Sequence, residues 1–324
     1  MQKIIAALLA FLALFRFVGG GNPAESLWPG EDFETGRAWW IWPAALEYLY
    51  GLRSQGVGRP ENDSLLVLYK GRLVYEHYGE GEDRDSLFPI FSCTKTVVAA
   101  LTGIAIKEGY IDGVDQKVID FYPDAVIAPG QESKLDMTIR HLLTMTSGLP
   151  QDLEEHCDDC MGAPDVGLAA FETPQAAVPG EKFLYSSNPG MQCLGGIIER
   201  RTGRSLYDYA SEKLFGPLGI TSVAWDTLGD GSSRAGSGIQ MTARDMLRLG
   251  YLYLHGGVWD GQRILPEGWV EQSKPGSNGY GYLICDYGDD LFLGGSYEAR
   301  GYGGQWITIC FDRDLVIART SRPA

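Results

Sequence analysis

The sequence predicts an α+β fold in which both ends of the chain build one antiparallel sheet and a helical section is inserted between them. Three observations carry this prediction: a β-hairpin pattern over 64–78, strand patterns in the last fifty residues, and helical spacing of apolar residues through most of 115–225. Such a sheet needs helices to cover its apolar surface. We expect a sheet domain made of 23–115 plus 225–324 and a mainly helical domain at 116–224, with an active site where the two meet.

The individual elements follow from local patterns. Strand-forming residues at Ser64–Tyr69 and Arg72–Tyr78 flank Lys70-Gly71, which is typical of a hairpin. Ser205 and Thr242 are each followed three residues later by aspartate, a pattern that begins helices. Further helices are predicted at Ala44–Ser54, Ser92–Glu108, Ile139–Met145 and Gly190–Arg201, and strands at Tyr280–Cys285, Gln305–Phe311 and Leu315–Thr320, the last two joined by a turn at Asp312–Asp314.

Composition narrows the possible partners. The chain has 324 residues, 44% hydrophobic and 21% charged, which is typical of a soluble globular protein. It carries 42 acidic against 27 basic residues, a formal charge of −15. That charge repels phosphate backbones and anionic lipid, so no nucleic-acid partner is expected. The same charge favours neutral or cationic small-molecule substrates over anionic ones.

Residues 1–22 differ from the rest of the chain. Lys3 precedes an apolar run, Ile4–Phe15, which is followed by Arg16 and three glycines. As a helix this run is about 18 Å long, too short for a bilayer core of about 30 Å. A signal peptide, and hence export to the periplasm or medium, is the preferred interpretation. An uncleaved membrane anchor and an amphipathic start of the mature fold are the alternatives.

The cysteines give one local signal. Of six, Cys93, Cys193, Cys285 and Cys310 stand singly among apolar neighbours and are expected to be buried. Cys157 and Cys160 form a C-x-x-C. No second such pair completes a zinc site, so a local disulfide in an exported protein is preferred, with free thiols or metal binding as alternatives.

Several common active-site motifs are absent. The sequence has no G-x-S-x-G, no H-E-x-x-H, no phosphate-binding G-x-x-x-x-G-K-[ST] and no dinucleotide G-x-G-x-x-G. Its four histidines, His77, His141, His156 and His255, lie in contexts that favour structural roles. A hydrolase built on this chain would therefore use a base other than histidine, and neither a cofactor nor a metal is expected.

One serine has a basic partner at helical spacing. Ser92-Cys93-Thr94-Lys95 is the single S-x-x-K in the chain, and it opens the predicted buried helix. At a spacing of three residues, both side chains lie on one face, at the positive end of the helix dipole. A serine needs a base to become a nucleophile, and a lysine withdrawn from water gives up its proton more readily. The alternative is a capping serine beside a lysine that faces solvent.

Two further segments could complete such a site. Phe183-Leu184-Tyr185-Ser186-Ser187-Asn188 offers Tyr185, since a tyrosine beside a lysine cation can accept and return a proton. Arg300-Gly301-Tyr302-Gly303-Gly304-Gln305 is expected to open a terminal strand whose free amide serves an oxyanion hole together with the Ser92 amide. The alternatives are a packed tyrosine and a glycine-rich turn before an edge strand.

Together these residues resemble the serine β-lactamase-like superfamily, which includes class C β-lactamases, D-Ala-D-Ala carboxypeptidases, family VIII esterases and 6-aminohexanoate-dimer hydrolases. The resemblance implies a β-lactamase/penicillin-binding-protein-like fold, with Ser92 as nucleophile, Lys95 as its activator and Tyr185 as general base or acid. It places the K-T-G element on Tyr302-Gly303-Gly304 and the second oxyanion amide on Gln305. The resemblance covers about residues 60–320. Three further segments within that range agree with the family pattern, namely 139–149, 217–220 and 242–245.

Two departures from the family pattern affect the predicted function. Asn188 comes one residue later than in Y-x-N, and taking it as the family asparagine would put Ser186 in place of Tyr185. Tyr302 replaces the lysine that holds the substrate carboxylate in β-lactamases. We therefore expect an acyl-serine hydrolase of esters or small amides rather than a β-lactamase or D-Ala-D-Ala carboxypeptidase. A catalytically silent binding or assembly protein is the alternative of a different class, and a metal or redox module at Cys157–Cys160 is a third.

Overall fold

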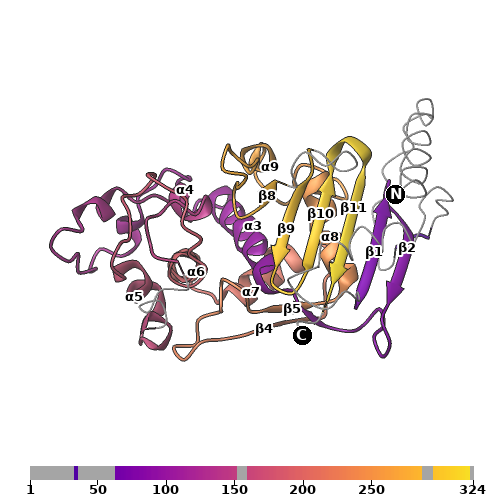
Figure 1. Cartoon of the computed structure of the whole chain (residues 1–324), viewed down its shortest axis with the longest axis horizontal. Coiled ribbons are helices and arrows are strands. Elements are labelled where there is room, and N and C mark those ends of the chain that lie inside the picture. The colour runs from indigo at the N-terminus through magenta and orange to yellow at the C-terminus, as the bar shows by residue number, and fades with distance from the viewer. Residues whose placement is uncertain (1–32, 36–62, 152–158, 287–294, 322–324) are drawn as a thin grey trace, which may run out of the picture.

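A six-stranded antiparallel sheet lies beside a helical region (Figure 1). The computed structural model describes residues 33–35, 63–151, 159–286 and 295–321. Within them the strands follow the spatial order β2-β1-β11-β10-β9-β8. Their bounds are β1 Ser64–Tyr69, β2 Arg72–Tyr78, β8 Cys285–Asp286, β9 Tyr297–Gly301, β10 Gln305–Cys310 and β11 Leu315–Thr320.

The sheet strands that come first and last in the sequence, β1 and β11, are neighbours in the sheet. β1 pairs with β11 from Ser64 opposite Thr320 to Tyr69 opposite Leu315, and with β2 on its other side. The two ends of the chain therefore build one sheet, with the helical section between them in sequence. The predicted fold class is confirmed, whereas the domain limits at 115/116 and 224/225 remain predictions.

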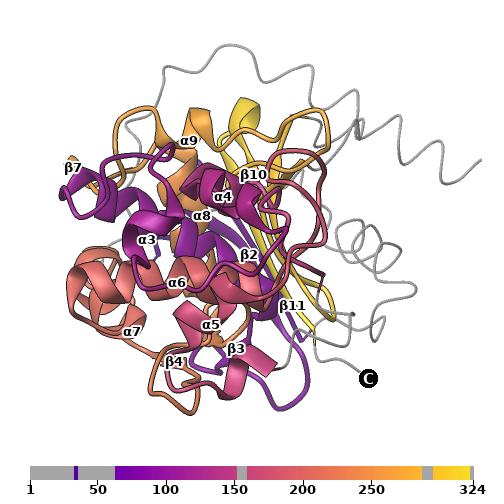
Figure 2. The same ribbon diagram turned by 90° about the vertical axis from the view of Figure 1, so that its left-hand side faces the viewer.

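Helices cover the sheet and form a second region beside it. α8 packs against β1, β10 and β11, while α3 packs against α6 and α7 (Figures 1 and 2). The described helices are α3 Thr94–Lys107, α4 Ile139–Leu143, α5 Val166–Glu172, α6 Pro189–Thr202, α7 Leu206–Ala210 (continued by a π-helical turn, Ser211–Phe215), α8 Ala243–Leu254 and α9 Trp269–Gln272.

Short strands connect these layers. β3 Phe88–Pro89, β5 Ile239–Met241 and β4 Val223–Trp225 form a small sheet, and β6 Val258–Trp259 pairs with β7 Gln262–Arg263. Of these, β3 and β5 matter for function because β3 leads directly into the segment that carries Ser92.

Most predicted elements are confirmed within one to three residues, but the strand Tyr280–Cys285 is wrong. There the chain folds on itself: Gly281 N donates to Ile284 O and Leu283 has a φ of +54°. Only Cys285–Asp286 join the sheet, as β8. The strand β9 was not predicted, because its charged residues Glu298 and Arg300 mask the alternation that marks a strand. The predicted helix Ala44–Ser54 lies outside the described residues.

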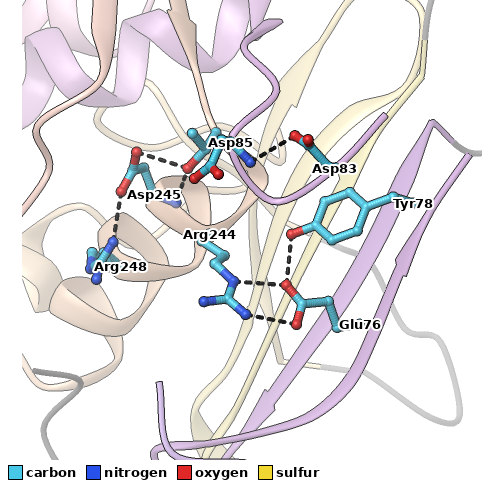
Figure 3. Close-up of polar contacts among 8 residues, drawn as sticks. Glu76, Tyr78, Asp83, Asp85, Arg244, Asp245 and Arg248 are labelled. Carbon is cyan, nitrogen blue, oxygen red and sulfur yellow. Dashed lines mark hydrogen bonds and ion pairs between the residues drawn. The ribbon is translucent and has the colours of Figure 1, made fainter. Parts of the chain in front are cut away.

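A polar cluster fastens α8 to the hairpin edge of the sheet (Figure 3). Arg244 donates from Nε and Nη2 to the two carboxylate oxygens of Glu76 at 2.7 and 2.8 Å, and Tyr78 donates to the same carboxylate at 2.7 Å. Burial pushes the pKa of Glu76 upward, but these hydrogen bonds outweigh it and leave the pKa below its ordinary value. Because α8 follows β5 directly, the cluster also steadies the strand pair that leads to Ser92.

No helix in the described part of the chain is long and apolar enough to cross a membrane. The segment 1–22, for which a signal or an anchor is predicted, lies outside the described residues, as does Cys157. The disulfide between Cys157 and Cys160 therefore stays a prediction.

Candidate active site

The backbone bends sharply just before Ser92. Ile90 N donates to Ile239 O of β5 at 3.0 Å, and Phe91 then has a φ of +45°, a left-handed conformation that side chains rarely adopt. A 3-10 turn, Phe91–Cys93, follows and continues into α3. Strain of this kind is common at functional sites. It leaves Ser92 partly exposed where the helix begins, next to amides that have no partner within the helix.

Lys95 contacts Ser92 from one helical turn further on. Its Nζ donates to Ser92 Oγ at 2.8 Å and to Gly236 O at 2.7 Å, and the residue is only 1% exposed. The amine is thus withdrawn from water and aimed at the hydroxyl. In its neutral form the same nitrogen could accept the hydroxyl proton across the same contact. Gly236 is a part of this site that sequence reasoning missed, since nothing local indicates that its carbonyl faces Lys95.

The helical region brings Tyr185 to the same lysine. The Tyr185 ring centroid lies 5.0 Å from Lys95 Nζ, and the ring is half-buried. Leu184 N donates to Met145 O at 2.8 Å, which fixes the segment that carries Tyr185. Ser92, Lys95 and Tyr185, which come from two regions of the chain, therefore meet in one cluster.

Ser186, the alternative to Tyr185, has a different position. It is fully buried, and its Oγ accepts a hydrogen bond from Gly190 N in the first turn of α6 at 3.0 Å. This satisfies one of the amides that a helix start leaves unpaired. Ser186 thus holds the start of α6.

Tyr280 is a second tyrosine at the site that sequence reasoning missed. Its ring meets the ring of Tyr185 edge-on at 6.3 Å and that of Phe183 at 5.3 Å. Burial, helped by the neighbouring Tyr185, raises the pKa of Tyr280 well above its ordinary value, so it stays protonated and is unsuited to act as a base. The apolar, aromatic pattern around Tyr280 predicts a strand and gives no sign of a site residue.

The segment 300–305 leads into the predicted strand at Gln305 and spans the turn before it. β9 ends at Gly301, Tyr302–Gly304 form the turn, and Gln305 begins β10, an interior strand. A Cβ at Gly301 would overlap Ile90 O, so only glycine lets β9 approach the bend before Ser92. The exposed Tyr302 ring meets the Phe91 ring edge-on at 5.8 Å. Gly301 and Tyr302 thus lie against the bend, at Ile90 and Phe91.

Gln305 lies deeper in the fold. It is 1% exposed, its side chain is hydrogen-bonded to the backbone of Ser321, and its carbonyl accepts a bond from Cys93 Sγ at 3.4 Å. These contacts join α3 and β10 and hold the end of β11. Its side chain therefore supports the site from behind.

Two of the described histidines, His141 and His255, have structural contacts. His141 Nδ1 accepts from Thr138 N at 3.2 Å, which closes the capping box of α4. The ring of His255 packs on Tyr251 at 4.3 Å. Burial lowers the pKa of both histidines, so the neutral form dominates at pH 7.

Gly304→Ala is expected to lower both stability and activity. Gly304 has a φ of +94°, and a Cβ there would overlap Nη1 of the fully buried Arg319, which donates to Gly304 O at 2.7 Å. The backbone strain alone costs about 1–2 kcal/mol, and the overlap displaces the turn that carries Tyr302. Thermal unfolding measures the first effect, and turnover of an ester, the substrate class expected from the sequence, measures the second.

Gly261→Ala is the matched control. Gly261 also lies in a hairpin turn with a positive φ, +74°, but no atom lies within 4 Å of a Cβ placed there. This variant should lose a similar amount of stability through backbone strain, and it should keep its turnover. Equal loss of turnover in the two variants would contradict a role for the 302–304 turn in the active site.

The fold and this serine–lysine–tyrosine cluster define a protein of the β-lactamase and penicillin-binding-protein type. The chain belongs to the Beta-lactamase family, whose family model matches residues 57–322.

Two curated relatives match most of the family region at low identity. The chain is 26% identical over 241 residues to 6-aminohexanoate-dimer hydrolase of Paenarthrobacter ureafaciens. This alignment covers 67% of the present chain and 58% of that protein. It is 28% identical over 225 residues to penicillin-binding protein 4 of Amycolatopsis lactamdurans, covering 60% of this chain and 58% of that one. The matched region thus spans less than two thirds of the length of these relatives.

Solved structures share the fold. A putative 6-aminohexanoate-dimer hydrolase from Bacillus anthracis superposes with a TM-score of 0.70 at 23% identity, over 82% of this chain and 75% of that one. EstCE1, described as a hydrolase with promiscuous acyltransferase activity, superposes with a TM-score of 0.67 at 18% identity, over 87% and 93%. The predicted membership of the serine β-lactamase-like superfamily is confirmed.

Proposed function

We propose that this protein is a serine hydrolase that cleaves a carboxylic ester or small amide through an acyl-Ser92 intermediate. The observation that carries the proposal is the contact of the buried Lys95 amine with Ser92 Oγ at 2.8 Å, with the Tyr185 ring beside the same amine. A nucleophile, a desolvated base and a second proton carrier are the groups that acyl transfer requires.

The proposed reaction has two halves. Ser92 Oγ forms a bond to the acyl carbon while its proton passes to the Lys95–Tyr185 pair, which returns it to the oxygen or nitrogen of the leaving group as that bond breaks. Water then attacks acyl-Ser92, giving up one proton to the same pair, and the acid leaves as Ser92 recovers its hydrogen. Each proton transfer of this kind contributes about 10²–10⁴-fold to the rate.

The oxyanion of each tetrahedral intermediate needs two amide donors. We propose Ser92 N–H and Tyr302 N–H, in place of the Gln305 amide favoured by sequence comparison. This choice is supported by the contacts of Gly301 and Tyr302 with the bend before Ser92. The Gln305 amide implied by the family resemblance stays the alternative, because Gln305 O accepts from Cys93 Sγ next to Ser92. Export through the 1–22 segment is part of the same proposal and rests on the sequence pattern alone.

Covalent labelling tests the proposal. A fluorophosphonate probe is expected to add one equivalent to the native protein, and p-nitrophenyl butyrate should be turned over. Trypsin releases Asp85–Lys95, which contains both Ser86 and Ser92, so fragmentation of this peptide locates the label.

Ser92→Ala should abolish both labelling and turnover, whereas Ser86→Ala, which removes a hydroxyl bonded to Asp83 on an exposed turn, should retain both. A native protein that takes up no probe and cleaves no ester, amide or nitrocefin would instead favour the catalytically silent alternative. Label on Ser86 would refute the assignment of the nucleophile.

A further inference from the structure

A pocket of about 460 Å³ lies beside the proposed active site. It is formed by the end of α4 and the residues after it, by 180–183, and by 272–282. Phe183 and Tyr280 belong to its wall, and Tyr280 also meets the Tyr185 ring at 6.3 Å. One aromatic side chain therefore separates the pocket from the proposed proton carrier.

The charge of the pocket is opposite to that of the whole chain. Arg140, Lys182 and Lys274 line it, against the single carboxylate of Glu181, while the protein carries −15. Local charge rather than net charge sets the potential that a ligand meets in a concave site.

The two lysines carry the available positive charge. Arg140 is held by Asp115 at 2.7 and 2.8 Å and donates to Tyr282 OH at 2.7 Å. The side chains of Lys182 and Lys274 are exposed, and neither ammonium group makes a hydrogen bond or ion pair with a protein group in the described part of the chain. The Glu181 carboxylate accepts a hydrogen bond from Val178 N at 3.3 Å, so part of its capacity to accept hydrogen bonds is already used.

The position of the pocket indicates which half of a substrate reaches it. In the proposed reaction Tyr185 helps to return the proton to the leaving group, so the leaving group must lie on the Tyr185 side of Ser92. Tyr280 and the pocket lie on that side of the site, beyond the Tyr185 ring.

We infer, on the basis of the proposed hydrolase function, that this pocket binds an anionic group on the leaving half of the substrate. The preferred substrate is then an ester or amide whose alcohol or amine part has an apolar or aromatic spacer, which packs along Phe183 and Tyr280, and a carboxylate that reaches Lys182 and Lys274.

Binding to an acylation-deficient protein tests this inference directly. We would titrate the Ser92→Ala variant with 3-(4-butyryloxyphenyl)propanoate and with the matching propanamide, which differ only in charge at the far end of the leaving group. The carboxylate is expected to bind about fivefold to tenfold more tightly, and added salt should reduce the difference because the lysines are exposed.

Charge-removing variants locate the effect. In the Ser92→Ala background, Lys182→Gln combined with Lys274→Gln should bring the two affinities together. Lys70→Gln, which removes an exposed lysine from the β1–β2 hairpin turn, should keep the difference. Equal affinities in the Ser92→Ala parent, or a preference that survives loss of both pocket lysines, would overturn the inference. Labelling of Ser92 in the native protein tests the hydrolase function separately, so the two proposals can fail independently.

Discussion

Lys95→Met is expected to reduce ester turnover by about 10³-fold or more while leaving the protein folded. Lys95 Nζ is the group in contact with Ser92 Oγ, and without it the hydroxyl keeps its proton at neutral pH. Methionine matches the length and fills the buried space without a charge. Lys95→Arg should not restore activity, because a guanidinium does not deprotonate in proteins. Steady-state kinetics, with folded protein quantified by thermal unfolding, measure the effect.

A second buried lysine provides the matched control. Lys134 is also 1% exposed, and it donates to the carbonyls of Thr173 and Glu172 at 2.7 and 3.2 Å. Burial lowers the pKa of Lys134 to about 8, but the structure gives it no nucleophile as a hydrogen-bond partner. Lys134→Met should lose about 1–3 kcal/mol of stability by leaving carbonyls unpaired, and keep its turnover per folded molecule. If both variants lost turnover equally, a general effect of buried lysines on the fold would explain the result.

Tyr185→Phe is expected to lower kcat by about 10²–10⁴-fold with little change in stability. The variant keeps the ring that packs between Lys95 and Tyr280 and removes only the hydroxyl. If Tyr185 carries the proton to the leaving group, the loss should grow as the leaving group becomes a poorer one. Comparing p-nitrophenyl butyrate with an alkyl butyrate measures this dependence.

Ser186→Ala separates the two possible assignments of this motif. Loss of the bond from Gly190 N should cost about 1 kcal/mol of stability, as expected for a hydroxyl that caps a helix start, and leave kcat unchanged. A large fall in kcat for Ser186→Ala together with a normal Tyr185→Phe would reverse the assignment.

Elements with strong local signals could be predicted from the sequence. The hairpin β1–β2 has the predicted bounds, since two residues of turn chemistry between strand-forming runs leave few alternatives. The helix α8 begins after Thr242, whose side chain accepts from Asp245 N, as the capping pattern predicts. Between Tyr280 and Cys285 the apolar, aromatic composition suited a strand, but a local hydrogen bond and a left-handed Leu283 decided the conformation.

The candidate active site shows the same difference between contacts set by local sequence and contacts set by tertiary packing. Helix geometry brings residues three apart onto one face, so the spacing of Ser92 and Lys95 predicted that they are neighbours. The burial of Lys95 in the fold then excluded a lysine that faces solvent and aimed its amine at Ser92 Oγ. Tyr185, Gly236, Tyr280 and Tyr302 reach the cluster through the packing of segments far apart in the chain, and no local pattern encodes those distances.

The net charge of the chain and the local charge of the pocket differ in the same way. The sequence determined a net charge of −15, from which neutral or cationic substrates were expected. The tertiary structure placed Lys182 and Lys274, ninety-two positions apart, in the wall of one pocket beside the site. Electrostatic energy falls with distance, so a ligand responds to the charges closest to it and not to their sum over the chain. That local arrangement, which only the fold decides, favours an anionic leaving group on an otherwise acidic protein.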